Sequence, residues 1–577
     1  MHTYFSMQFT GLKKTISGFL SKLSYNTFIA LTFTGLFLIT ELYLYWLGRL
    51  QGVFWQTDDI GYIVIFFLFL RLLAAPGYLY LSVLILIQIL QLSEISYFLF
   101  TGTYYGPAEL ALLSRQYKDF WGSLQETVIL LLVPATIIFL TALVLILIQL
   151  KTAHKSFQMG RRAGYLLLML WLAIPLVHAY TEDNSMRFDP DPGKTAFRNG
   201  INAFSYYTVW DLFSGQSDKA GKIYQPYEAM ELSEPLTVKP VNLVIIMGES
   251  ITYTHMGLYD YKLDTTPFLN SLRNQPGLIF RPAISSAVST HVSIPMFYNI
   301  QYEPDNRTHI ASGATNLYRL AKSKGFQTVF ISSQEMYAIA SQVSHGNVDI
   351  WMEQKHLASF PGKYDDRLLS ALDNLPIDWD RRFLITLNPR AGHIPYAKHV
   401  PEELLNFSRG LIKSDYHRYM QATYDDAMHY FDHVAEQIVT TVQQHTSNPT
   451  IVVITSDHGQ RLGETTGYGH NTLEFGSARV PFIYYGIDTP REIDLLAENM
   501  GCLVTHYEIG HLLAHLIGYR VYNPNEIDQV YYMNGIDISG RGGHLRYSKT
   551  EALEDPTHTL DTCTTTGAIG QSQNPHQ

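Results

Sequence analysis

The segment NLVIIMGES, residues 242–250, is a short apolar run followed directly by an acidic residue. The run is rich in β-branched residues and lies between Pro240 and Gly248, as is typical of a buried strand in a parallel sheet. Similar runs follow along the chain: QTVFISS near 327, RFLITLN near 382, TIVVITS near 450 and VPFIYYG near 480. Helical patterns lie between them, and strands that alternate with helices predict a doubly wound α/β domain, here over 241–545.

Residues that can bind a metal follow three of these predicted strands. Glu249 comes directly after the first run, and Asp457 and His458 come directly after TIVVITS. His393 lies a few residues past RFLITLN. Because α/β proteins bind ligands beyond the carboxyl ends of their strands, we expect these side chains to meet at one edge of the sheet. Carboxylate and imidazole together suit zinc or manganese, although each residue alone also fits an ordinary cap or hydrogen bond.

Hydroxyl groups gather in SSAVSTHVSIPMFYN, residues 285–299, which has the pattern of a loop entering a helix. The N-terminus of such a helix offers N–H groups to a phosphoryl oxygen. A hydroxyl bound to a divalent cation loses its proton readily and becomes a nucleophile. Plain caps and turns are equally rich in hydroxyls. The candidates are Ser285, Ser286, Ser289, Thr290 and Ser293.

Apolar runs dominate the first 180 residues. A spanning helix needs about 20 mostly apolar residues, so we expect a five-span transmembrane domain over 1–180, with spans near 27–49, 60–74, 77–100, 125–150 and 164–180. Lys and Arg collect in the N-terminal arm, at Arg71 and after the fourth span. The positive-inside rule then places the N-terminus in the cytoplasm and the C-terminal domain outside it.

Two further segments complete the predicted organisation. Residues 181–240 form a linker whose aromatic stretch, 200–215, fits either an interfacial helix at the membrane or a helix packed against the soluble domain. Residues 546–577, rich in Thr, Gln and His, have the composition of a disordered tail. The net charge of −10 argues against nucleic acid as a partner.

A set of motifs between 242 and about 486 follows a fixed order. It begins with GESITYTHMGLYDYKLDTTPFLN and continues with STHVSIP, the GH of NPRAGH, SDHGQRLGE, GYGHN and ARVPFIYYG. In this order the motifs resemble those of the lipid phosphoethanolamine transferases, a family within the alkaline phosphatase and sulfatase superfamily. The five predicted spans also resemble the architecture of this family. Position 460 is Gln, where many lipid A-modifying members have Glu.

The resemblance implies a role for each matching residue. Thr290 matches the threonine that carries phosphoethanolamine and contacts the metal. His393 and His470 match histidines that contact the substrate phosphate or a second metal. Zinc, as one or two ions, is the family's usual cofactor. The remaining metal ligands match Glu249, Asp457 and His458.

The implied function is transfer of phosphoethanolamine from phosphatidylethanolamine, through a covalent phosphothreonine, to an envelope glycolipid such as lipid A or the LPS core. The enzyme would lie in a bacterial inner membrane with its catalytic domain in the periplasm. Two alternatives remain: a phosphoglycerol transferase of the same superfamily, and a non-catalytic membrane protein that senses lipid. A sulfatase is disfavoured because Ser293-Ile294-Pro295 is not followed by the x-Arg of a formylglycine motif.

Overall fold

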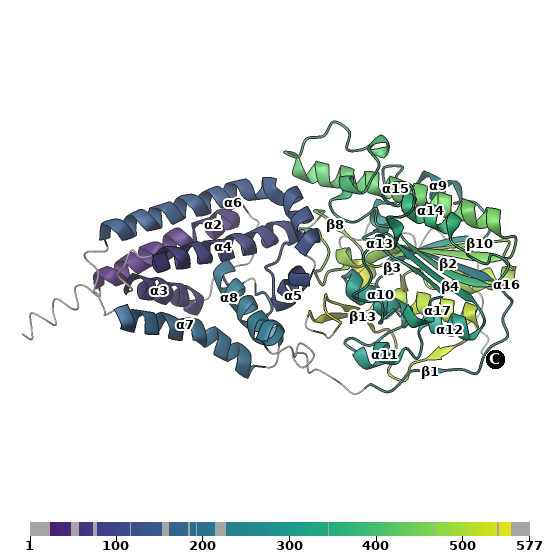
Figure 1. Ribbon diagram of the computed structural model, residues 1–577, viewed down its shortest axis with the longest axis horizontal. Helices are drawn as coiled ribbons and strands as arrows, with labels where there is room; N and C mark the ends of the chain where they lie inside the picture. Colours follow the sequence, from purple (N-terminus) through teal and green to yellow (C-terminus); the bar gives the residue numbers. More distant parts are fainter. Residues whose placement is uncertain are drawn as a thin grey trace, which may run out of the picture. The chain divides into compact units, whose positions relative to one another are not determined.

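The chain combines a helical N-terminal region with an α/β domain (Figure 1). The computed structural model describes residues 24–47, 57–72, 78–115, 117–152, 161–182, 185–191, 193–213, 227–343, 345–464, 467–538, 540 and 542–555. Two compact units divide the chain, Met1–Lys222 and Ile223–Gln577. The first unit therefore includes most of the predicted linker.

The apolar runs of the first unit form long helices. A helix at Ser24–Phe37 continues after a 41° bend as Ile39–Trp46. Among the described residues, Tyr80–Thr101 and Thr127–Thr152 are long and apolar enough to cross a membrane, and the bent pair adds a third crossing if it counts as one span. The five-span topology thus stays a prediction. The helices are α2 (Ile39–Trp46), α3 (Thr57–Leu72), α4 (Tyr78–Thr101), α5 (Pro107–Arg115), α6 (Tyr117–Thr152) and α7 (Arg161–Thr181).

The aromatic stretch of the predicted linker packs within the first unit. It forms α8 (Ala196–Tyr207), which continues as a π-helical turn, η3 (Thr208–Phe213). Phe197 is buried in the same apolar cluster as Trp171 of α7, and Tyr206 is fully buried beside Phe188. The α-helix ends at Tyr207, before the end of the 200–215 segment expected from sequence. Its aromatic rings are buried against neighbouring helices.

The second unit is built on an eight-stranded sheet with the order β11-β3-β10-β7-β2-β6-β4-β5. All five expected runs are strands, and β7, β2, β6 and β4 are parallel. The strand β10 runs antiparallel to β7 and β3, so the sheet is mixed. The strands are β2 (Asn242–Gly248), β3 (Leu278–Ile284), β4 (Gln327–Ser332), β5 (Ile350–Met352), β6 (Phe383–Asn388), β7 (Thr450–Ser456), β10 (Arg479–Ile487) and β11 (Val504–Thr505).

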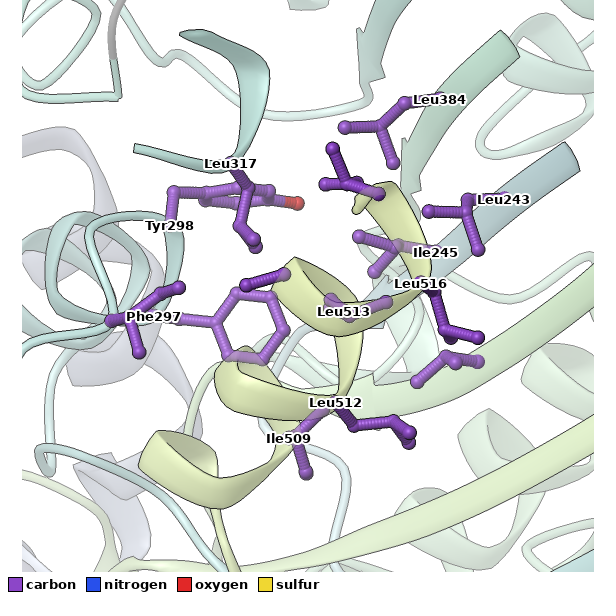
Figure 2. Packing of buried hydrophobic residues seen from close by; sticks show 14 of the residues in the cluster. Leu243, Ile245, Phe297, Tyr298, Leu317, Leu384, Ile509, Leu512, Leu513 and Leu516 are labelled. Atoms are coloured by element: carbon purple, nitrogen blue, oxygen red, sulfur yellow. The ribbon is translucent and has the colours of Figure 1, made fainter. Parts of the chain in front are cut away.

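Helices cover both faces of this sheet (Figure 1). The alternating residues Leu243 and Ile245 of β2 face the cluster that contains Leu513 and Tyr298 (Figure 2). On the other face, a Cβ on Gly248 would lie 3.2 Å from Phe431. The faces carry α10 (Thr290–Tyr298), α12 (Leu317–Ser323) and α17 (His506–Ile517) on one side and α9 (Pro267–Ser271), α14 (Asp366–Asn374) and α15 (Tyr416–His445) on the other.

Part of the segment expected to be disordered is ordered. The strand β14 ends at Tyr547 and pairs with β13, and Ser548 and Glu551 form a capping box at the start of α18. Asp555 then accepts a hydrogen bond from the buried Arg479. Composition alone misses these contacts, and residues 556–577 lie outside the described residues. The smaller elements are α11 (Arg307–Ser312), α13 (Gln354–Leu357), α16 (Arg491–Glu498), α18 (Lys549–Glu554), β1 (Glu231–Leu232), β8 (Arg461–Leu462), β9 (Tyr468–Gly469), β12 (Val521–Tyr522), β13 (Tyr531–Asn534) and β14 (His544–Tyr547).

We expect Leu513→Ala to destabilise the protein by about 2–5 kcal/mol, because a buried leucine leaves a cavity between α17 and the sheet. Leu495→Ala, at a side chain that is 39% exposed on α16, is the matched control. The measurement is the thermal midpoint of the full-length protein in detergent. Equal midpoints for the two variants would contradict the assignment of the core.

Candidate metal and phosphoryl-transfer site

Glu249 and Asp457 lie side by side at the carboxyl ends of two neighbouring strands. The register of β2 and β7 pairs Gly248 with Ser456, so the next residue of each strand is acidic. The backbone N–H of Asp457 donates to the Gly248 carbonyl at 3.1 Å, which extends the pairing into the site. One oxygen of each carboxylate and one nitrogen of His458 all lie within 4.8 Å of one another.

The charges of this cluster call for a cation. Burial, and next the Asp457 carboxylate, raise the pKa of Glu249. Asp457 Oδ1 accepts the N–H groups of Ser250 and His458 at 3.0 and 2.8 Å. Asp457 Oδ2, although buried, accepts no hydrogen bond from any described residue. An oxygen left without a donor between a second carboxylate and an imidazole fits a divalent cation, which these three side chains would hold.

A backbone contact fixes the orientation of the His458 ring. Its Nδ1–H donates to the Gly459 carbonyl at 2.9 Å, so the lone pair of the neutral ring is on Nε2. Nε2 faces the cluster, 3.6 Å from Glu249 Oε1. A hydrogen bond from the second ring nitrogen to a carbonyl is the usual support of a metal-binding histidine.

Thr290 places its hydroxyl at this cluster. It is the first residue of α10, directly after the extended N-cap residue Ser289. Its Oγ1 lies 3.3 Å from Glu249 Oε2 and 3.1 Å from His458 Nε2. Other hydroxyls of the segment have different partners: Ser285 donates to the Ala287 carbonyl, and Ser293 lies 3.4 Å from His506. The structure thus brings Thr290 together with the three predicted ligands.

The two further predicted histidines border the cluster. The ring of His470 lies 4.0 Å from that of His458, and its Nδ1 lies 3.0 Å from Gln460 Oε1. Burial, and next the neighbouring His458, hold the pKa of His470 well below its usual value. His393 is partly buried, and a positive charge on its ring would lower the pKa of the Glu249 carboxyl.

The loop that carries His393 lies against the backbone of Glu249. A Cβ on Gly392 would lie 2.2 Å from the Glu249 carbonyl oxygen, so only glycine allows this approach. Gln460 also donates a hydrogen bond to the Tyr396 hydroxyl. The amide therefore links the His470 ring to the loop of His393.

Two residues of the site were not predicted from the sequence. Ser250 has a positive φ of 59° and donates its hydroxyl to Glu249 Oε1 at 2.8 Å. His506, at the start of α17, accepts the N–H of Ser286 at 3.2 Å and so supports the loop before Thr290. A serine next to a ligand was visible in the sequence, but its left-handed backbone was not. The contact of His506 joins segments 220 residues apart.

We expect Asp457→Asn to weaken zinc binding by more than about 100-fold. The variant removes one of the two negative charges of the candidate metal site. Asp425→Asn is the matched control, since this buried carboxylate pairs with His255 instead. Chelator competition on the full-length protein measures the affinity. Unchanged affinity in Asp457→Asn would remove this residue from the metal site.

Stability at acid pH should depend on His506. Burial lowers its pKa from 6.5 to about 3. Below pH 6.5 this histidine is protonated in the unfolded chain but stays neutral in the folded protein. The free energy of unfolding therefore falls as the pH drops. Between pH 7 and pH 5 this proton costs about 2 kcal/mol. His506→Gln should lose correspondingly less stability over that range, as measured by thermal unfolding; an identical pH dependence would contradict a neutral, buried His506.

Comparisons with known proteins find related sequences and folds. A family model described as Sulfatase matches residues 241–519. The Kdo(2)-lipid A phosphoethanolamine 7''-transferase of Escherichia coli K12 is 24% identical over 282 residues, which cover 46% of this chain and 47% of that protein. The phosphatidylethanolamine transferase Mcr-1 of Escherichia coli is 23% identical over 483 residues, or 78% of this chain and 86% of that protein. The chain thus spans about half the length of the first of these relatives.

A solved structure extends the likeness to both units. The integral membrane protein lipooligosaccharide phosphoethanolamine transferase A (EptA) from Neisseria meningitidis has a TM-score of 0.53 and 16% sequence identity. The match covers 86% of this chain and 95% of that protein, and it shows the shared fold. Residues 241–519 thus match the Sulfatase family model, and the chain is similar over most of its length to proteins named as phosphoethanolamine transferases.

Proposed function

We propose that this protein transfers phosphoethanolamine from phosphatidylethanolamine to an envelope glycolipid, with Thr290 as the covalent carrier. Lipid A or the LPS core is the leading acceptor. One observation carries the proposal: the Thr290 hydroxyl lies 3.1 and 3.3 Å from two side chains that suit a divalent metal. The names of the relatives support the ethanolamine headgroup over a glycerol one.

Glu249, Asp457 and His458 would hold zinc, which suits a mixed carboxylate and imidazole set. A bound ion supplies positive charge that lowers the pKa of the Thr290 hydroxyl and neutralises phosphoryl oxygens. One or two ions are compatible with the proposal, since His393 and His470 lie beside the same cluster.

The reaction then has two steps. Thr290 Oγ1 loses its proton and attacks the phosphorus of the donor; the bond from phosphorus to the diacylglycerol oxygen breaks, and that oxygen takes up a proton. Phosphoethanolamine remains as an ester of Thr290. An oxygen of the acceptor next attacks the same phosphorus, the bond to Thr290 Oγ1 breaks, and the threonine hydroxyl regains its proton. His393 and His470 contact the phosphoryl oxygens or carry protons, and the N-terminus of α10 favours the negative charge.

The N-terminal helices fit this chemistry because donor, leaving group and acceptor are all lipids. A water-soluble enzyme would have to extract acyl chains at about 0.8 kcal/mol per methylene. We place the five predicted spans in a bacterial inner membrane, with the catalytic domain on the periplasmic side. The concentration of cations in the N-terminal arm and after the fourth predicted span supports this orientation.

Thr290→Ala should abolish release of diacylglycerol from phosphatidylethanolamine, while Thr290→Ser should keep part of it because the hydroxyl remains. Ser293→Ala, at a neighbouring hydroxyl that contacts His506, is the control and should retain activity. Mass spectrometry of the Thr290 peptide from membrane-expressed protein should show added phosphoethanolamine.

Full activity of Thr290→Ala would refute the covalent step. A mass increase equal to phosphoglycerol would favour the related phosphoglycerol transferases, and a wild-type protein that takes up no zinc and forms no adduct would favour a lipid sensor.

A further inference from the structure

A cavity of about 260 Å³ lies beside the loop that carries His393. Three cationic side chains line it, those of Arg367, Arg390 and Lys398, against the single carboxylate of Asp365. These groups leave an excess of two positive charges, although the whole chain has a net charge of −10. We call this cavity the basic pocket.

The basic pocket and the phosphoryl-transfer site share one loop. Asp365 is buried, and its Oδ1 accepts the backbone N–H of Arg390 at 2.9 Å. The Arg390 carbonyl in turn accepts the N–H of His393 at 3.0 Å. His399, which also lines the pocket, has its ring 5.7 Å from the ring of His393. A group bound in the pocket therefore lies next to the proposed phosphate-binding histidine.

The electrostatic environment of His399 agrees with the excess of cations. Burial lowers the pKa of His399 to about 2, and the positive charges of His393, Arg390 and Lys398 contribute to the same shift. Burial is the larger cause, and the smaller contribution of the neighbouring cations is what an anion in the pocket would offset. Arginine side chains bind phosphate through paired N–H groups, and lysine adds a mobile positive charge.

We propose that the basic pocket binds a phosphate group of the acceptor glycolipid during the second step. This assignment rests on the proposed function. Phosphatidylethanolamine carries a single phosphate, which must lie at Thr290, and its ammonium group would be repelled by the pocket. A second anion site beside the first thus belongs to the second substrate. The pocket selects acceptors that bear a phosphate in addition to the attacking oxygen.

The test compares the full-length, zinc-loaded wild type with the double variant Arg367→Gln/Lys398→Gln. Arg409→Gln is the matched control, because Arg409 Nε donates to the Leu405 carbonyl at 3.2 Å much as Arg367 Nε donates to the Gly362 carbonyl at 3.1 Å. The probes are bisphosphorylated lipid A, the same lipid after enzymatic removal of its phosphates, and inorganic phosphate. The single variant Lys398→Gln, at an exposed residue, replaces the double variant if the latter unfolds.

We expect the dissociation constant for bisphosphorylated lipid A to rise at least about tenfold in the double variant. Binding of the dephosphorylated lipid, and release of diacylglycerol from phosphatidylethanolamine without acceptor, should stay within about twofold, a change small beside the tenfold loss. The control variant should match the wild type in every assay.

Several results would overturn the assignment. One is equal affinity of wild type and double variant for lipid A. Another is slower release of diacylglycerol in the double variant, which would mean that the pocket serves the donor. A third is inorganic phosphate that binds the pocket as tightly as lipid A. A wild type that binds lipid A through the pocket but releases no diacylglycerol supports the pocket and refutes the transferase function instead.

Discussion

The α/β domain is arranged around two buried carboxylates that neighbouring strands of the sheet bring together. β2 and β7 are neighbours in register, and Glu249 and Asp457 are the first residues past their ends. Two buried anions at this separation repel each other, and burial penalises each charge separately. Protonation of one carboxyl group relieves part of this cost, and a divalent cation between the two carboxylates relieves it while both stay ionised. An ion bound here would therefore stabilise the folded edge of the sheet as well as serve the proposed reaction.

Other parts of the domain are arranged around that edge. The N-terminus of α10 brings Thr290 to the carboxylates. His506 of α17 accepts a hydrogen bond from Ser286 in the loop that precedes this helix. The loop of His393 approaches from the third strand end, where Gly392 permits contact with the Glu249 backbone. Gln460 then connects this loop to His470. Three strand ends and one helix start thus converge, and residues of the same loop line the basic pocket.

Much of this arrangement could be predicted, because buried parallel strands have a strong sequence signal. The apolar runs at β2, β6 and β7 located Glu249, His393 and Asp457 at one edge without any knowledge of contacts. β3 was missed because Arg281 and Pro282 interrupt its apolar run, and its pairing with β10 and β11 shows it to be a strand.

Long-range hydrogen bonds were equally invisible to sequence reasoning. The bond from Arg390 N to Asp365 joins two loops that no local pattern relates. The ordered end of the domain at α18 was missed because its composition hides a local capping box at Ser548 and a distant contact between Asp555 and Arg479. The number of membrane crossings stays a prediction from hydropathy.

The contact between His458 Nδ1 and the Gly459 carbonyl has an evolutionary consequence. In many metalloproteins a carboxylate side chain orients the metal-binding imidazole, and a single codon change can remove it. Here the acceptor is a main-chain oxygen, which every amino acid supplies. Substitutions in the surrounding sequence can therefore change which molecules the domain binds. The Nε2 atom of His458 would still face the Glu249 carboxylate. Relatives that come to use different acceptor substrates would be expected to keep this tautomer of the histidine.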